Sequence, residues 1–297
     1  MIINSGNLEA LRTGFNATFR RGLGQAETSY GRIATTVSST TKESKYGWLG
    51  KMPNMREWLG ERVVHGIAEH DYAIKNVPYE LTLGVDRDDI EDDNLGVYTP
   101  LFTEMGASVA AHPDQLVWGA LKNGFDAPCY DGQAFFDTDH PVIGEDGRFV
   151  TASNNGGGAG AAWYLLNTKR ALKPIIHQER RKAQFVSLDN PRDPNVFQKK
   201  EFLYGTDGRW NVGYAFWQMA YGSKQALTAA NYSSARSAMM SLKGDYGRPL
   251  GLVPDLLVVP PQLEDAARRL LNSDAGAGGE TNPWKGTAEL MVVPWLA

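Results

Sequence analysis

Cysteine is nearly absent from this 297-residue chain, which contains only Cys129. A single cysteine excludes an intramolecular disulfide and a zinc site built on several cysteines, and it is typical of a reducing compartment. The sequence has no run of 18 apolar residues, so we expect no membrane-spanning helix. Its opening, MIINSGNLEALRTGF, has no apolar stretch of the kind found in signal peptides, so we expect no secretion.

An excess of positive charge and the common catalytic motifs are missing as well. The net charge of −4 and a pI near 5.8 argue against a chain whose main task is to coat nucleic acid. The sequence contains no HExxH, GxSxG or GxxxxGK[ST] motif. Because 42% of its residues are hydrophobic and 22% are charged, we expect a soluble globular protein with one large domain or two ordinary ones.

A few short segments contain residue types that bind ligands. In FFDTDHP, Asp137, Asp139 and His140 could ligate a metal or exchange a proton, although aspartates before a proline are also typical of turns, which we favour. The acidic run DRDDIEDD (86–93) lacks the glycine and the register of a calcium loop, which favours a helix start. The run GGGAG (156–160) favours a flexible loop. No histidine neighbours Cys129 in sequence, which favours a packing role for its thiol.

The stretch 77–85 has the period of a half-buried strand, because Val77, Tyr79, Leu81, Leu83 and Val85 alternate with other residues. Residues 63, 65 and 67 alternate in the same way. A turn near 68–71 would join the two stretches into one long hairpin. An isolated hairpin is only marginally stable in water, so we expect this one to lie on its own domain or on another molecule.

Apolar spacing predicts three helices. One begins near Pro100, is broken at Pro113 and ends at 123–124; a second follows a Thr228 cap and ends before Gly244. The third lies in LLVVPPQLEDAARRLL (256–271), where an apolar strand leads into it through two prolines. Because proline offers no backbone N–H to a phosphate, this turn favours scaffolding over nucleotide binding. The related runs LLVVP (256–260) and LMVVP (290–294) are expected to pair in one sheet.

Several segments together resemble the major head subunit (T protein) family of Mu-like phages and prophages. They are 58–93, YDGQAFFDTDHP (130–141), ALKPIIHQER (171–180), 201–223, LTAANYSSAR (227–236), 247–267 and NPWKGTAELMVVPWL (282–296). The resemblance covers most of the chain. It implies an α+β, tailed-phage major capsid fold (HK-97-like). The implied parts are an N-terminal arm (1–43), an extended β-hairpin or E-loop (44–93), a peripheral domain with a long spine helix (94–225) and an axial domain (226–297).

The resemblance also implies a structural function without catalysis, metal or cofactor. Copies of the chain would self-assemble through hexamers and pentamers into the icosahedral shell around a double-stranded DNA genome. Because the chain begins at the implied arm, we expect a separate scaffolding protein, together with a portal, a decoration protein and weak non-specific contact with packaged DNA. The expected location is the virion, after the host cytoplasm, with no membrane involved.

Two groups of residues follow as candidate contacts. Those expected to meet neighbouring subunits are Trp48, Leu49, Met52, Arg56, Glu57, Trp58, Glu61 and Arg62. Arg12, Arg20 and Arg21 would face DNA if the arm packs on a neighbour or a polyanion, whereas a frayed terminus is the alternative. The rival functions are a soluble metal-dependent hydrolase that uses Asp137, Asp139 and His140, and a free sheet-based binding module.

Overall fold

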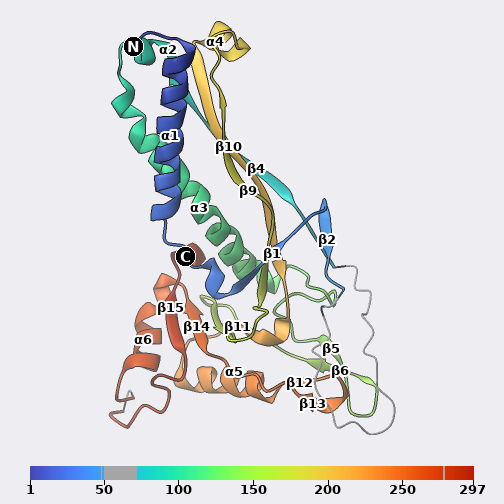
Figure 1. Cartoon of the computed structure of the whole chain (residues 1–297). Helices are drawn as coiled ribbons and strands as arrows, with labels where there is room; N and C mark the ends of the chain where they lie inside the picture. Colours follow the sequence, from blue (N-terminus) through green and yellow to red (C-terminus); the bar gives the residue numbers. More distant parts are fainter. Residues whose placement is uncertain (48, 50–71, 277) are drawn as a thin grey trace.

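The computed structural model describes residues 1–47, 49, 72–276 and 278–297. The molecule is elongated and contains two separate sheets (Figure 1). A four-stranded sheet with two long helices occupies the upper part of this view, and a five-stranded sheet with two shorter helices occupies the lower part. The predicted mixture of helices and sheets is therefore present.

The four-stranded sheet has the order β1-β9-β10-β4. Its strands are β1 (Ala34–Ser38), β9 (Ile175–Leu188), β10 (Glu201–Tyr214) and β4 (Val77–Asp86). The predicted half-buried strand at 77–85 is confirmed, because burial alternates along β4. On one side β4 pairs antiparallel with β10, with ten residues in register and apolar side chains on the same face, and β4 forms the edge of this sheet. Residues 63–67, the predicted other side of the hairpin, lie outside the described residues.

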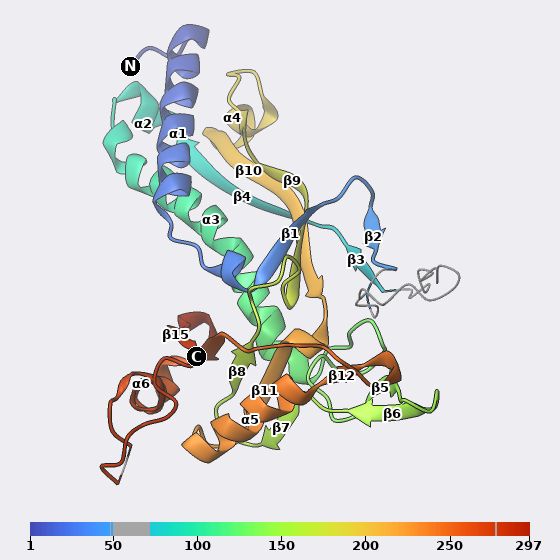
Figure 2. The same cartoon turned by 60° about the horizontal axis from the view of Figure 1, so that its bottom comes forward.

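The helices α1 (Ser5–Gln25) and α3 (Thr99–Lys122) cover one face of this sheet (Figures 1 and 2). The Phe15 ring of α1 stacks on Phe102 of α3 with 4.2 Å between centroids. The helices cross at glycines, since a Cβ on Gly106 would lie 2.1 Å from the carbonyl oxygen of Phe19. The alternative of a frayed N-terminus is therefore wrong, because the apolar face of α1 is buried and β1 joins the sheet.

Helix α3 continues through Pro113, so the predicted break at this residue is wrong. Proline removes one backbone hydrogen bond and crowds the preceding turn. Buried side chains on both sides of it, including Met105, Val117 and Trp118, hold the helix against the sheets. Tertiary packing outweighs the local preference here. The predicted position of Pro100 in the first turn is confirmed.

The five-stranded sheet has the order β15-β14-β8-β11-β7. Its strands are β15 (Glu289–Val292), β14 (Leu256–Val259), β8 (Trp163–Leu166), β11 (Ala220–Lys224) and β7 (Asn155–Gly158). The predicted pairing of 256–260 with 290–294 is confirmed by β14 and β15, which are parallel. Part of the glycine run predicted as a loop forms the edge strand β7.

Both faces of the two central strands are buried. Trp163 and Leu165 of β8 pack with helices α5 (Ala229–Ser241) and α6 (Glu264–Asn272), while Tyr164 and Leu166 pack with the end of α3. Thr228 caps α5 as predicted, and the proline corner before α6 forms a short 3-10 turn at Pro261–Leu263. The strands β7, β8 and β11, which precede residue 226, share this sheet with β14 and β15, which follow it. The expected boundary between the peripheral and axial domains at residue 226 therefore falls within one sheet.

Short elements complete the described chain. The two-stranded antiparallel sheets are β2 (Glu43–Lys45) with β3 (Ala73–Lys75), β5 (His140–Ile143) with β6 (Phe149–Ala152), and β12 (Lys243–Gly244) with β13 (Arg248–Pro249). The short helices are α2 (Arg87–Glu91) and α4 (Pro194–Lys199). The acidic run starts α2 as predicted, with the Asp86 side chain accepting from the backbone N–H of Asp88 at 2.7 Å.

Candidate functional site

The predicted catalytic trio is not brought together. The Asp137 carboxylate accepts hydrogen bonds from the backbone N–H groups of Thr138 at 2.6 Å and Asp139 at 3.3 Å, which is the predicted turn. The Asp139 residue is exposed, whereas His140 is completely buried. These three residues therefore form a turn and one core side chain rather than a hydrolytic centre.

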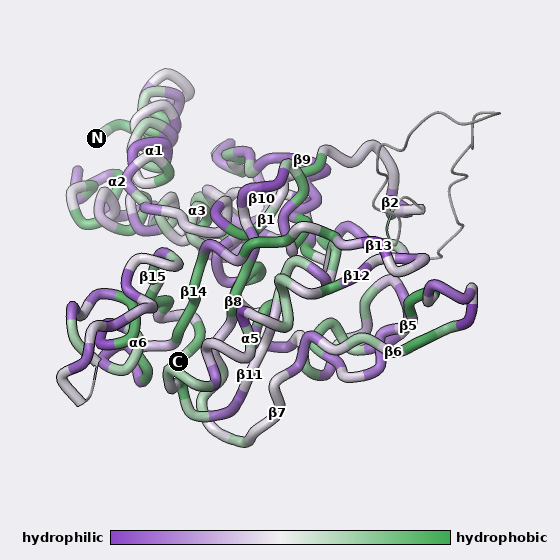
Figure 3. The backbone as a smooth tube through the Cα atoms, turned by 90° about the horizontal axis from the view of Figure 1, so that it is seen from below, coloured by the Kyte–Doolittle hydropathy of each residue, from purple (hydrophilic) through white to green (hydrophobic). Residues whose placement is uncertain are grey.

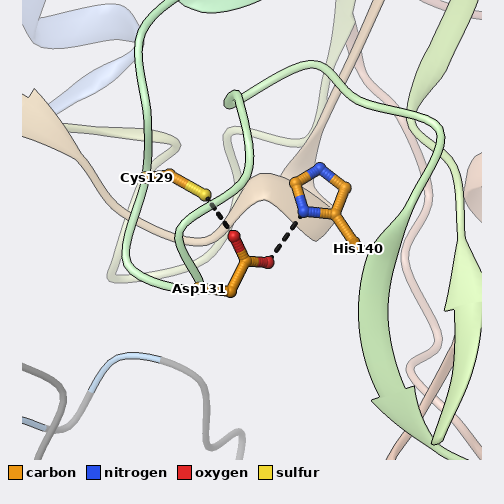
Figure 4. A group of neighbouring side chains, drawn as sticks. All are labelled: Cys129, Asp131 and His140. Atoms are coloured by element: carbon orange, nitrogen blue, oxygen red, sulfur yellow. Dashed lines mark hydrogen bonds and ion pairs between the residues drawn. The ribbon is translucent and has the colours of Figure 1, made fainter.

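His140 instead belongs to a buried group with Cys129 and Asp131 (Figure 4). Its Nδ1 lies 2.8 Å from Oδ2 of Asp131, and its Nε2 lies 3.2 Å from Oδ1 of Asn154. The ring stacks on Trp217 with 3.9 Å between centroids and a 7° angle between planes. Sequence reasoning missed Asp131 and Asn154, which are separated from His140 by 9 and 14 residues in a loop-rich stretch.

The hydrogen bonds of Asn154 fix the orientation of its amide group next to this histidine. Its Nδ2 donates to the carbonyl oxygens of Phe135 and Ala220 at 2.8 and 3.1 Å, so the opposite atom is the oxygen. The imidazole is thus held between the Asn154 amide oxygen on its Nε2 side and the Asp131 carboxylate on its Nδ1 side, and the Trp217 ring covers one of its faces.

Cys129 is at the other end of this chain of contacts. Its thiol donates to Oδ1 of Asp131 at 3.0 Å. Burial, followed by the nearby negative charge of Asp131, raises the pKa of the Cys129 thiol well above its ordinary value, which leaves it a poor nucleophile. Burial alone would raise the pKa of Asp131, but hydrogen bonds from His140 and Cys129 outweigh burial and lower it.

Among the described residues, this is the one group of three whose atoms are close enough to hold a metal ion, within 4.8 Å of one another. The two oxygens of Asp131 are engaged with different partners, the thiol on one side and the imidazole on the other. The arrangement is thus a linear chain of satisfied hydrogen bonds rather than a set of ligands around a point. Its effect is to fix the loop 127–154 to the rest of the core.

Most of the predicted intersubunit residues fall outside the described part of the chain. Trp48, Met52, Arg56, Glu57, Trp58, Glu61 and Arg62 are among these. Leu49 is described and is fully buried in the main core with Tyr46 and Ile74. A single copy of the chain therefore already covers the Leu49 side chain.

The predicted DNA-facing arginines all lie on α1. Arg20 and Arg21 are exposed, and Nε of Arg20 donates to Oδ1 of Asn16 at 3.1 Å. Arg12 lies 3.8 Å from the carboxylate of Asp189 and 3.7 Å from that of Glu9. Much of the charge of Arg12 is therefore balanced within the chain, whereas Arg20 and Arg21 present their charge to the outside.

Several large exposed apolar side chains belong to segments at the end of the molecule that contains α2 and α4, an end that Figures 1 and 2 show. We call this set the apolar tip; it consists of Ile2, Val97, Leu101, Leu188 and Phe197, and Phe197 is 90% exposed. Sequence reasoning missed Phe197, because α4 is too short to show a helical period.

A second exposed set lies on the β5–β6 hairpin and the adjoining β12–β13 turn, which we call the apolar corner. It consists of Phe149, Val150 and Tyr246, and Phe149 is 78% exposed. In Figure 3 a hydrophobic stretch of β6 lies at the periphery of the molecule, while the strands β14 and β8 of the five-stranded sheet lie inside. The turn contacts the hairpin through the Asp245 carboxylate, which accepts from the backbone N–H of Ile143 at 3.0 Å.

Backbone strain coincides with these two sets. The described non-glycine residues with positive φ are Asp93, Lys200 and Tyr246, at 62°, 60° and 61°. Asp93 and Lys200 lie beside the apolar tip, and Tyr246 belongs to the apolar corner. Such conformations are disfavoured for side chains with a Cβ and are concentrated at functional positions. The two ends are therefore the strongest candidates for contacts with other molecules.

The described helices are all too short or too polar to cross a lipid bilayer. The model of the family described as Mu-like prophage major head subunit gpT matches residues 8–296. The major capsid protein of Escherichia phage Mu is 44% identical over 305 residues, which cover 100% of both chains. The Mu-like prophage FluMu major head subunit of Haemophilus influenzae is 45% identical and covers 91% of this chain and 90% of its own.

Solved capsids share the fold. A chain of the procapsid of bacteriophage JBD30 superposes with a TM-score of 0.88 at 45% identity, covering 99% of this chain and 100% of its own. A chain of the JBD30 capsid gives a TM-score of 0.79 at 33% identity, with 100% of both chains covered. The expected tailed-phage capsid fold is confirmed, and the chain belongs to the family of Mu-like prophage major head subunits.

Proposed function

We propose that this chain is the major head protein of a Mu-like phage or prophage, and that many copies assemble into an icosahedral shell around double-stranded DNA. The observation that carries the proposal is the location of exposed apolar side chains at two opposite ends of an elongated subunit. A closed shell needs more than one contact surface on each subunit, because a single self-complementary surface gives only a dimer. Family membership supports the same conclusion.

We assign the capsid domains to the two sheets. The four-stranded sheet with α1 and α3 forms the peripheral domain, and α3 is its spine helix. The five-stranded sheet with α5 and α6 forms the axial domain, which therefore takes in residues before 226, such as β8 and β11. The paired strands β2 and β3 form the base of the proposed E-loop, and the predicted contacts Trp48, Met52 and Trp58 lie between them in sequence.

The proposed partners are first of all further copies of the chain. Trimers of a minor capsid protein decorate the related JBD30 capsid, which supports a decoration protein for this shell as well. A separate scaffolding protein and a portal complete the proposal. The protein would be made in the host cytoplasm and end in the virion.

Contact with the packaged DNA would be weak. Arg20 and Arg21 are exposed on α1, but the chain as a whole has a net charge of −4. A shell built from such subunits would attract the DNA phosphates only near these arginines, and salt would weaken the attraction. The combined Arg20→Glu and Arg21→Glu variant should form shells that retain less DNA at low salt, whereas equal retention in both shells would contradict this assignment.

Electron microscopy of the purified protein tests the main proposal. Wild-type protein should form closed shells or capsomers as its concentration rises, because many modest contacts become strong together on closure. A variant in which a Gly-Ser linker replaces residues 50–71 should keep its fold, measured by circular dichroism, and should fail to close. A wild-type protein that stays a single small species at every concentration would contradict the proposal.

A further inference from the structure

We propose that Gln178 is a positioning residue, which fixes the direction in which β2 and β3 leave the four-stranded sheet and thereby the size of the shells that copies form. This inference rests on the proposed function, in which β2 and β3 are the base of the E-loop. Each of the two strands is only three residues long, and Figure 2 shows both beside the four-stranded sheet rather than within it. A pair this short is marginally stable alone, so its orientation must come from contacts with the sheet.

Gln178 is fully buried in the middle of the four-stranded sheet. It lies on β9, in register with Val37 of β1 on one side and Asn211 of β10 on the other. Its Nε2 donates to the carbonyl oxygen of Ile74 in β3 at 2.9 Å, and its Oε1 accepts from the hydroxyl of Tyr46, directly after β2, at 2.7 Å. One side chain of the sheet therefore holds both strands of the short pair.

A second buried amide extends these contacts. Asn76 directly follows β3, and its Oδ1 accepts from Nε2 of Gln178 at 2.9 Å. Its Nδ2 donates to Oγ of Ser39, which follows β1, and to the carbonyl oxygen of Thr41, both at 2.9 Å. The side chains of this network are at most 5% exposed. We call the four of them the polar clamp: Tyr46, Gln178, Asn76 and Ser39.

The polar clamp provides direction, which apolar contacts do not. Ile74 of β3 packs so closely on β10 that a Cβ on Gly213 would overlap its side chain, but such packing restricts distance more than angle. Hydrogen bonds require both distance and angle. Turning β2 and β3 away from the sheet would leave the two buried amides without partners, which is costly. A buried polar network in which every member is satisfied therefore favours one arrangement.

The orientation of this base bears on how a shell closes. Identical copies that meet head to tail close into a ring or shell only at particular angles, and other angles give open or irregular assemblies. A contact surface that is held at one angle in every subunit gives one particle size. If the base of the E-loop could swing, the subunits would meet at a range of angles, and particles of several sizes would form.

Spin labels on unassembled subunits test the clamp directly. Glu43→Cys on β2 and Gln184→Cys on β9 place one label at each exposed position, whereas the native Cys129 is buried. Double electron–electron resonance should give one narrow distance distribution, and Gln178→Leu should broaden it by about twofold or more, because the directional bonds are lost. The matched control is Ile176→Val, which shortens a buried side chain of the same strand and should keep the narrow distribution. An equally narrow distribution in Gln178→Leu would overturn the proposal.

Particle diameters separate positioning from a purely structural role. Gln178→Leu should give several particle sizes or open shells by negative-stain electron microscopy. Val259→Ala, which leaves a cavity in the five-stranded sheet, should lose stability in urea and still give the wild-type diameter. Tyr46→Phe removes one bond of the clamp and decides the matter if Gln178→Leu does not fold; it should broaden the diameters less. Wild-type diameters in every folded variant of the clamp would overturn the proposal.

The two measurements distinguish failure of this inference from failure of the proposed function. If the wild-type protein forms shells and the clamp variants form the same shells, only the positioning role is wrong. If the wild type forms no assembly at any concentration, the proposed function fails, and the effect on shell size fails with it.

Discussion

The two sheets of the molecule differ in how completely they are covered. In the five-stranded sheet, Trp163 and Tyr164 are adjacent residues that face opposite layers, and both are fully buried. In the four-stranded sheet, α1 and α3 cover one face, and Val186 and Leu188 of β9 remain about half exposed. One chain therefore completes its own core at the five-stranded sheet, whereas the four-stranded sheet leaves apolar side chains exposed.

The largest expected effect comes from the residue that joins the two regions. Trp118 of α3 is fully buried in the main core, which contains residues of both sheets, and its Nε1 donates to Oγ of Ser29 at 3.0 Å. Trp118→Ala should lower the free energy of unfolding by about 3–5 kcal/mol in urea denaturation, because it leaves a large cavity. Trp295→Ala, at a position 45% exposed, should cost much less. Equal costs would contradict the described core.

A smaller effect is expected where α1 crosses α3. Gly106→Ala should destabilise by about 1–3 kcal/mol, because the new Cβ would meet the backbone of α1. The matched control is Gly119→Ala on the same helix, where nothing lies within 4 Å of the new Cβ. That change should be neutral or stabilising by about 0.5–1 kcal/mol, because alanine favours helix. Thermal unfolding of both variants would measure the contrast, and a stabilising Gly106→Ala would place α1 elsewhere.

The buried His177 of β9 should make stability depend on pH. Burial, together with the charge of His112, lowers the pKa of His177 from 6.5 to about 4, and neither ring nitrogen has a partner among the described residues. The unfolded chain therefore takes up a proton that the folded chain excludes, so stability falls as pH decreases from 6.5 towards about 4. His177→Leu should show a shallower fall in urea denaturation across that range. Parallel curves for the two proteins would contradict this account of the core.

The smallest effect on folding is expected at the apolar corner. Phe149→Ser should leave the free energy of unfolding within about 0.5 kcal/mol of wild type, because the ring is 78% exposed and contributes little to the core. The same variant should raise the concentration needed for assembly. A large loss of stability would mean that this ring supports its own subunit, and it would remove the corner from the set of contact surfaces.

Local structure could be predicted where a few neighbouring residues decide it. The alternation at 77–85 and the Thr228 cap are of this kind, because a strand period or a single side-chain oxygen is enough. The partner of β4 could not be predicted, because β10 lies more than a hundred residues away in sequence. The helix break at Pro113 was wrong for a related reason: distant packing partners outweigh the local preference of proline.

The buried side-chain contacts and the exposed apolar side chains were even harder to predict from the sequence. A buried chain such as Cys129–Asp131–His140 requires a folded loop, and the sequence grouped His140 only with Asp137 and Asp139, as the less favoured alternative to a turn. Phe197 looks like any apolar residue until the structure shows that its neighbour Val196 is buried and its own ring is not. Exposure of this kind depends on the whole fold, which is why it could not be inferred from a short pattern.

The central claim is that identical copies cover the apolar side chains that a single subunit leaves exposed. Hydroxyl-radical labelling of unassembled subunits and of assembled particles, read by mass spectrometry, tests it most directly. Phe197, Phe149 and Tyr246 should be labelled in the subunit and protected in the particle, while Trp118 should be protected in both states. Equal labelling of the three exposed rings before and after assembly would contradict the account.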